Sequence, residues 1–167
     1  MAFQVALIGV GNEERGDDGV GLLVLRTLRA SLEGRLRLLE LGGRVDRLLE
    51  ALDGCEVAII VDAVQSGAPA GVIHRFEYVN GSLPTNGLRG STHTMSVGDA
   101  LELAWILKKL PSHILVYGIE GRAFDLGDPM TPEVRSAAQE VCQRILEDVG
   151  RLEDRTIGPC PSARQAL

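Results

Sequence analysis

Two carboxylates and one imidazole in this sequence each stand where a predicted strand or loop gives way to the next element. Asp18 ends an acidic loop after the first apolar run, Asp62 comes directly after a later apolar run, and His93 closes a stretch rich in glycine and proline. Two oxygen ligands and an imidazole nitrogen suit Ni²⁺, Zn²⁺ or Mn²⁺ and leave coordination positions open for substrate or water. The fold decides whether these three side chains meet.

Each of these side chains also has a simpler interpretation. Asp17 and Asp18 precede a predicted helix, where an Asp side chain accepts from the free N–H groups of the first turn. Asp62 can be a cap or the acceptor of a loop hydrogen bond, and His93 can be an ordinary loop histidine. At a helix N-terminus, however, the dipole lowers imidazole basicity and favours the neutral ring that binds metal. The residues alone leave these alternatives open.

The acidic loop is unsuited to phosphate binding. The dinucleotide fingerprint requires its third glycine where this chain has Glu14, and the loop's carboxylates would repel an anion. The common hydrolase motifs are missing as well, since the sequence has no His-Glu-x-x-His, Gly-x-Ser-x-Gly or Asp-Thr/Ser-Gly motif. A loop of this charge favours a cation or a cationic peptide.

The elements that position these residues follow from hydrophobic periodicity. Apolar runs without a helical period predict strands buried on both faces, as in a parallel sheet. The alternation over 71–78 predicts a half-exposed, antiparallel strand at an edge. We therefore expect an α/β fold, a three-layer α/β/α sandwich with a mostly parallel five-stranded sheet. The predicted strands are 3–10, 35–41, 56–61, 71–78 and 113–119, and the predicted helices are 20–32, 45–52, 97–110 and 132–149.

The remaining histidines and the cysteines are assigned no chemistry. His74 falls within the edge strand and is interpreted as exposed or cross-strand, and His113 at the start of the last strand as a surface residue. Cys55, Cys142 and Cys160 are widely separated and odd in number, so they are predicted to be reduced packing residues.

Composition limits the class of protein. The 167 residues fit one domain, placed at 1–150, and the segment 151–167 lacks an amphipathic repeat and is predicted to be a flexible tail. A hydrophobic content of 45 % and a net charge of −6 indicate a globular protein that binds no nucleic acid. The sequence shows no basic leader before an apolar core and no apolar run of about 18 residues, so we expect a cytoplasmic protein without membrane contact.

An ordered series of short motifs extends over about residues 4–149. The series resembles the hydrogenase maturation endopeptidases, the nickel-dependent proteases that trim the C-terminus of the [NiFe]-hydrogenase large subunit. Each motif is short, but their combination and order are specific. The motifs are Gly9-Val10-Gly11-Asn12, Asp17-Asp18-Gly19-Val20-Gly21, Asp62-Ala63, Ser91-Thr92-His93, Gly118-Ile119-Glu120 and Thr131-Pro132-Glu133-Val134.

The resemblance implies a metal site. In that family an acidic residue at the end of the first loop, the Asp after the third strand and a His before the following helix bind the metal. Matched position by position, these fall on Asp18, Asp62 and His93, which are also the expected catalytic residues. The first ligand is often Glu in the family, and Asp18 is shorter by one methylene, with Asp17 as the alternative. The implied cofactor is nickel carried by the substrate, and zinc or cadmium could occupy the same site.

The resemblance also implies a partner and a reaction. The expected substrate is a [NiFe]-hydrogenase large-subunit precursor that already holds nickel, and the expected activity is endopeptidase cleavage of its C-terminal peptide. The alternative is a non-catalytic, nickel-dependent chaperone or carrier that holds the precursor through the same ligands. We expect a monomer. Exposed backbone at Gly42–Gly43 and over 80–92 is expected to contact an extended peptide.

Overall fold

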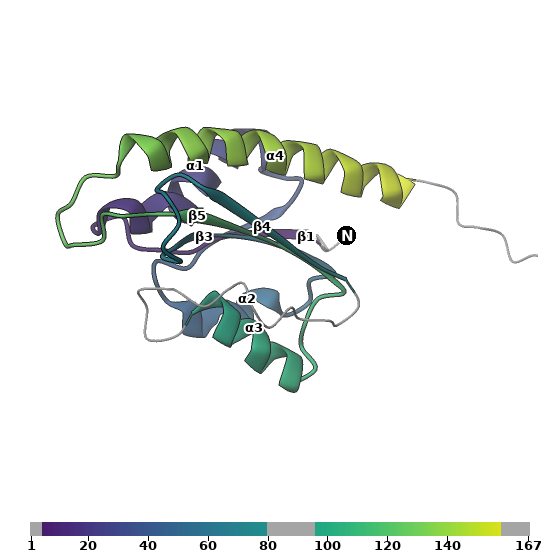
Figure 1. The fold of residues 1–167 in the computed structure, drawn as a ribbon. Coiled ribbons are helices and arrows are strands. Elements are labelled where there is room, and N and C mark those ends of the chain that lie inside the picture. Colours follow the sequence, from purple (N-terminus) through teal and green to yellow (C-terminus); the bar gives the residue numbers. More distant parts are fainter. Residues whose placement is uncertain (1–4, 80–95, 158–167) are drawn as a thin grey trace, which may run out of the picture.

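Five strands form one sheet at the centre of the molecule (Figure 1). In the structure, a computed structural model that describes residues 5–79 and 96–157, they follow the order β2-β1-β3-β5-β4. Neighbouring strands run parallel except for β4, which pairs antiparallel with β5 at one edge. This arrangement confirms the predicted sheet. The strands are β1 (Val5–Gly9), β2 (Arg37–Glu40), β3 (Val57–Val64), β4 (Ile73–Val79) and β5 (His113–Glu120).

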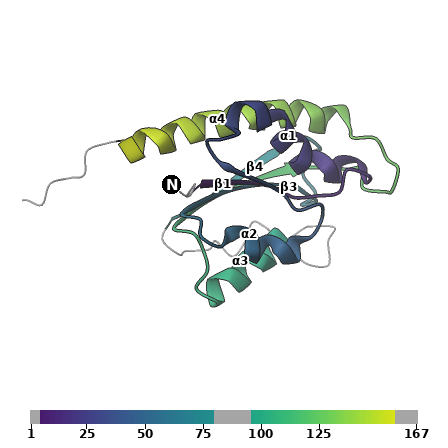
Figure 2. The same ribbon diagram turned by 180° about the vertical axis from the view of Figure 1, so that it is seen from behind.

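Helices cover both faces of the sheet, which confirms the three-layer sandwich (Figure 1 and Figure 2). One face carries α1 (Val20–Leu32) and α4 (Pro132–Ile157), and the other carries α2 (Leu48–Leu52) and α3 (Val97–Ile106). Two short 3₁₀ helices, η1 (Gly16–Gly19) and η2 (Val45–Arg47), lead into α1 and α2. Within the described ranges, no helix combines the length and the apolar character that crossing a membrane requires.

The core consists of two apolar clusters, one on each face of the sheet. Successive side chains of a strand point to opposite faces, so the central strands supply both clusters. Ile59 and Val61 of β3 pack with α1 and α4, whereas Ala58 and Ile60 pack with α2 and α3. A side chain's position in a central strand therefore shows which layer it faces.

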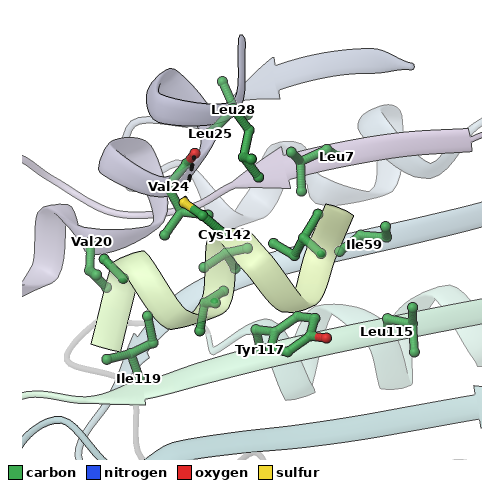
Figure 3. Close-up of a cluster of buried hydrophobic side chains, with 14 of the residues drawn as sticks. Leu7, Val20, Val24, Leu25, Leu28, Ile59, Leu115, Tyr117, Ile119 and Cys142 are labelled. Carbon is green, nitrogen blue, oxygen red and sulfur yellow. Dashed lines mark hydrogen bonds between the residues drawn. The ribbon is translucent and has the colours of Figure 1, made fainter. Parts of the chain in front are cut away.

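Cys142 is a packing residue, as predicted (Figure 3). Its Sγ lies 3.9 Å from the carbonyl oxygen of Val24 within the cluster beneath α1 and α4. Burial raises the pKa of the Cys142 thiol, and burial likewise raises that of Cys55. Both are free thiols, and Cys160 lies outside the described residues.

The last helix is longer than the sequence predicted. α4 continues to Ile157, so residues 151–157 are helical, and the predicted boundary of a flexible tail at 151 is wrong. Ion pairs form at this end of the helix. Arg151 Nη1 lies 3.2 Å from Asp148 Oδ1, and Arg35 Nη2 lies 2.7 Å from Glu153 Oε2. Charged pairs support a helix without producing an apolar repeat, which is why hydrophobic periodicity missed these two turns. Residues 158–167 lie outside the described part of the chain.

Candidate functional site

The carboxyl ends of β1 and β3 pack against the start of α1. The N–H of Val10 donates to the carbonyl oxygen of Val61 at 2.9 Å, which joins the two strand ends. Gly21 lies directly against them, because a Cβ at this residue would clash with both the Val10 and the Val61 carbonyl oxygens. Glycine thus allows α1 and the preceding η1 to approach the sheet edge closely, and η1 contacts β3.

Asp18 lies in η1 at this edge and is 1 % exposed. Its Oδ2 accepts the N–H of Asn12 at 3.0 Å, so the carboxylate closes the loop that follows β1. The side chain of Asn12 accepts the N–H of Glu14 at 2.9 Å within the same loop. Neither Asp17 nor Asp18 caps α1, since the N-cap is Gly19 and no side-chain cap bond is made there. The interpretation of the two aspartates as helix caps is therefore wrong.

Asp17 is a structural acceptor that joins η1 to the loop before α4. Its Oδ1 accepts from the N–H and the hydroxyl of Thr131 at 2.7 and 3.0 Å. Its Oδ2 accepts the N–H groups of Arg122 and Ala123 at 2.9 and 3.1 Å. Four donors fill the acceptor capacity of a carboxylate. This arrangement disfavours Asp17 as a metal ligand and leaves Asp18 as the better candidate of the pair.

Asp62 lies within β3 and not after it, which corrects the predicted strand end at 61. It pairs with Gly118 of β5, and its side chain faces the same layer as Ala58 and Ile60, beneath α2 and α3. The residue is only 3 % exposed. Because Asp62 lies inside a strand, it is not a helix cap. Buried carboxylates in proteins are hydrogen-bonded, paired with a cation or bound to metal.

The third predicted ligand, His93, lies outside the described residues. The helix that follows it in the sequence, α3, begins with a capping box. There Ser96 Oγ accepts the N–H of Asp99 at 3.1 Å, and Asp99 Oδ2 accepts the N–H of Ser96 at 2.9 Å. α3 packs on the sheet face to which Asp62 points. Residues 5–79 and 96–157 contain no group of three His, Cys, Asp or Glu side chains that could hold a metal ion.

Sequence analysis missed a buried carboxylate at the end of β5. Glu120 is 1 % exposed and accepts from the N–H and hydroxyl of Ser66, both at 2.8 Å, and from the N–H of Gly67 at 3.0 Å. His74 Nε2 lies 3.2 Å from the same carboxylate. Burial alone would raise the pKa of Glu120, but the donors from Ser66 and His74 lower it below its ordinary value. The signal available in the sequence was an acidic residue directly after an apolar run, which is the same signal that pointed to Asp62.

An open cleft lies beside the Asp18 loop, above the carboxyl ends of β1 and β2. Arg26 borders it and pairs with Glu13 at 2.5 Å and with Glu40 at 2.9 Å. Gly42, one of the predicted substrate contacts, lines the cleft with positive φ of 51°. The other predicted contact segment, 80–92, lies outside the described residues. The lining residues are Gly11, Asn12, Glu13, Glu14, Leu22, Arg26, Glu40, Leu41, Gly42 and Arg44.

Comparisons with known proteins agree with the motifs. Residues 23–148 match the family model described as hydrogenase maturation protease (HycI). The chain is 24 % identical over 164 residues to the hydrogenase expression/formation protein HupD of Thiocapsa roseopersicina, covering 92 % of this chain and 74 % of that protein. The hydrogenase maturating endopeptidase HybD from E. coli shares the fold, with a TM-score of 0.74, 20 % identity, and coverage of 88 % of this chain and 92 % of that one. The [NiFe] hydrogenase maturation protease HybD from Thermococcus kodakarensis has a TM-score of 0.63 at 25 % identity, covering 87 % and 98 %.

Proposed function

The chain belongs to the hydrogenase maturation protease family, and from this premise we propose that it removes the C-terminal peptide of a [NiFe]-hydrogenase large-subunit precursor after nickel insertion. Family membership makes the protein an endopeptidase that acts on a hydrogenase large-subunit precursor. The proposal adds the recognition element. Nickel arrives with the substrate, and Asp18, Asp62 and His93 bind it.

One observation carries this proposal: Asp18 and Asp62, from separate segments, are almost inaccessible carboxylates at the same edge of the sheet. Carboxylate oxygens are ligands of a type that a divalent ion presented by the precursor would accept. His93 precedes α3, which covers the face to which Asp62 points, and this supports it as the third ligand.

Binding through the precursor's own metal accounts for both positioning and timing. Three ligands on a substrate-borne ion would fix the scissile peptide beside it. The ion would then polarise the peptide carbonyl or activate a bound water molecule. A precursor without nickel offers no such link, so premature cleavage is disfavoured by the lost binding energy. Zinc or cadmium, which accept the same oxygen and nitrogen ligands, would occupy the site as substitutes.

A cleavage assay tests the proposal. Nickel-loaded and nickel-free precursors are each incubated with the protein, and the large subunit is weighed by mass spectrometry. We expect loss of the C-terminal peptide only from the nickel-loaded precursor. Equal cleavage of both precursors would contradict nickel-dependent recognition. Tight binding with unchanged mass would instead identify a chaperone or carrier.

Removing the imidazole at position 93 tests the ligand set. His93→Ala should abolish cleavage of nickel-loaded precursor and leave the circular dichroism spectrum of the protein unchanged. A matched control is His113→Ala. His113 lies at the amino end of β5, whereas Asp18 and Asp62 lie at the carboxyl ends of the parallel strands. Cleavage at the normal rate by the His93 variant would show that this residue does not hold the metal.

A further inference from the structure

Three consecutive large apolar residues are exposed at the end of α3. The exposed fractions of Trp105, Ile106 and Leu107 are 53, 62 and 51 %. Successive residues of an α-helix point about 100° apart, so three in a row cannot all face the sheet, and Leu101 and Ala104 supply the buried side of α3 instead. Single exposed apolar residues are ordinary, whereas adjoining ones mark a binding surface. We call Trp105, Ile106 and Leu107 the α3 patch.

The α3 patch stands away from the sheet. In both views α3 begins toward the carboxyl edge of the sheet and slopes outward, so its last turn is the part of the helix farthest from the strands (Figure 1 and Figure 2). A partner can therefore reach the patch without any rearrangement of the core.

A tight turn fixes the end of α3. The N–H of Lys108 donates to the carbonyl oxygen of Trp105 at 3.0 Å, and the N–H of Lys109 donates to that of Ala104 at 2.8 Å. Lys108 has a φ of 55°, in the left-handed region where a helix commonly ends in glycine. Because these bonds order the backbone next to the patch before any partner binds, docking costs less conformational entropy.

The border of the α3 patch carries more positive than negative charge. Lys108 and Lys109 are the only lysines of a chain whose net charge is −6, and both are exposed. Within residues 5–79 and 96–157 neither forms an ion pair, whereas arginines such as Arg26 and Arg35 pair with carboxylates. Glu102, one turn before the patch, is also exposed and offsets one of the two charges. A protein surface with an apolar recess and carboxylates around it would complement this arrangement.

We propose that the α3 patch docks the hydrogenase large-subunit precursor through an apolar recess with an acidic border on the precursor. This inference rests on the proposed function, which supplies the partner. A stable protein interface buries about 800 Å² on each partner and is roughly 30 Å across, whereas three ligands on one ion cover little area. The ten residues of α3 extend over about 15 Å, so one interface of that size reaches from the start of α3 to the patch.

Two other occupants fit the α3 patch less well. A two-fold dimer through this surface would bring Lys108 and Lys109 of one copy near those of the other, and like charges repel. An anionic membrane would repel a chain with a net charge of −6, which two lysines offset only in part. A precursor with acidic groups beside an apolar recess meets neither obstacle.

Trp105 is the only tryptophan of the chain, so a label on it reports on the α3 patch alone. Protein that contains 5-fluorotryptophan gives one ¹⁹F resonance, and the position of that resonance differs between H₂O and D₂O when the ring is exposed. The nickel-free precursor is the probe, because on the proposed function it is not cut. We expect the solvent effect in the free protein and its loss when nickel-free precursor is added.

Three results of the ¹⁹F measurement would overturn the proposal. The first is a solvent effect that persists at the highest concentration of nickel-free precursor. The second is its loss when the concentration of the protein alone is raised, which would identify a second copy as the occupant. The third is its loss with anionic phospholipid vesicles and not with precursor, which would identify a membrane surface.

Single-turnover cleavage of nickel-loaded precursor by excess protein measures what the patch contributes. Trp105→Ala should raise the protein concentration that gives half the maximal rate by about 30-fold, as expected for a central aromatic anchor. It should leave the maximal rate constant unchanged, because the patch lies at the end of α3 away from the proposed ligands. Leu146→Ala is the matched control, since Leu146 is an exposed leucine of α4 on the opposite face of the sheet. Its half-maximal concentration should equal that of the wild type.

Lys108→Gly tests the charge at the border without disturbing the helix end. Glycine adopts a φ of 55° more readily than lysine, so the fold should be at least as stable. The half-maximal concentration should rise about threefold at low salt, and the difference from the wild type should shrink as salt is added.

The outcomes separate this inference from the proposed function. If Trp105→Ala and Lys108→Gly keep the wild-type half-maximal concentration while only nickel-loaded precursor is cut, the docking role falls and the proposed function stands. If Trp105→Ala lowers the maximal rate constant together with the melting temperature, Trp105 is a structural residue and the docking role falls as well. If the wild-type protein cuts neither precursor, the proposed function falls, and the ¹⁹F resonance still decides whether the precursor covers the patch.

Discussion

Asp17 is expected to stabilise the fold, whereas its neighbour Asp18 is expected to serve cleavage. The substitution Asp17→Asn separates these roles, because it keeps the size of the side chain and removes one acceptor oxygen. The wild-type carboxylate accepts four hydrogen bonds, three from backbone N–H groups of the loop before α4 and one from the Thr131 hydroxyl. The asparagine NH₂ group must face at least one of these donors.

The size of the effect follows from these contacts. One buried N–H group left without an acceptor costs about 1–3 kcal/mol, and the loss of charge weakens the remaining bonds by about 1 kcal/mol more. We therefore expect Asp17→Asn to lower the free energy of unfolding by about 2–4 kcal/mol. For a chain of this length, that change lowers the melting temperature by roughly 4–16 °C. Thr131→Val removes only the hydroxyl donor and should cost about 1 kcal/mol.

Thermal unfolding followed by circular dichroism, together with the precursor cleavage assay, provides the test. Asp18→Asn should cleave nickel-loaded precursor far more slowly, and it should melt much closer to the wild type than Asp17→Asn does. If the melting temperature of Asp17→Asn lies within roughly 1 °C of the wild-type value, the lost hydrogen bonds contribute little stability and Asp17 does not join η1 to the loop before α4. A reversed pattern, in which only Asp18→Asn is destabilised, would refute the assignment of the two roles.

Three further predictions follow from the fold. Gly21→Ala should lower the free energy of unfolding by about 3 kcal/mol in urea titrations, because its Cβ would clash with backbone carbonyl oxygens at the ends of β1 and β3. The pKa of Glu120 is lower in the folded protein than its unfolded value of about 4.3. The stability that this carboxylate contributes is therefore present above the unfolded pKa and is lost as the pH falls through the folded pKa. Glu120→Gln should reduce the pH dependence of unfolding in that acidic range. Burial, followed by the hydrogen bond to Asp148, raises the pKa of Tyr117 to about 12, so its phenol should ionise near that pH in an ultraviolet titration, and Tyr117→Phe should remove that step.

The sequence predicted the architecture because the central strands are apolar on both faces. The helix over 20–32 was predicted with its observed bounds, since its apolar stripe begins and ends with the helix. Strand ends were less accurate, because β3 and β5 continue through acidic residues. Asp62 is buried inside β3 and Glu120 is buried as the last residue of β5, where periodicity predicted loops. Carboxylates are tolerated in these strands because tertiary partners, which no local pattern reveals, surround them.

The candidate site was predictable only in part. The positions of Asp18 and Asp62 followed from the rule that carboxyl ends of parallel strands share one edge. The distinction between Asp17 and Asp18 did not, since it depends on donors from a loop more than a hundred residues away in the sequence. His74 was interpreted as a cross-strand residue, and its pairing with Glu120 required the register of β4 against β5. The ligand assignments for Asp18, Asp62 and His93 stay predictions.

The most direct test of the central claim is X-ray absorption at the nickel edge. Spectra are recorded for the nickel-loaded precursor alone and for its complex with the protein, frozen before cleavage. We expect the complex to show added oxygen and imidazole nitrogen ligands on nickel, and we expect Asp62→Asn to reduce them. A nickel spectrum that does not change when the wild-type protein binds would contradict the claim that these side chains hold the metal carried by the precursor.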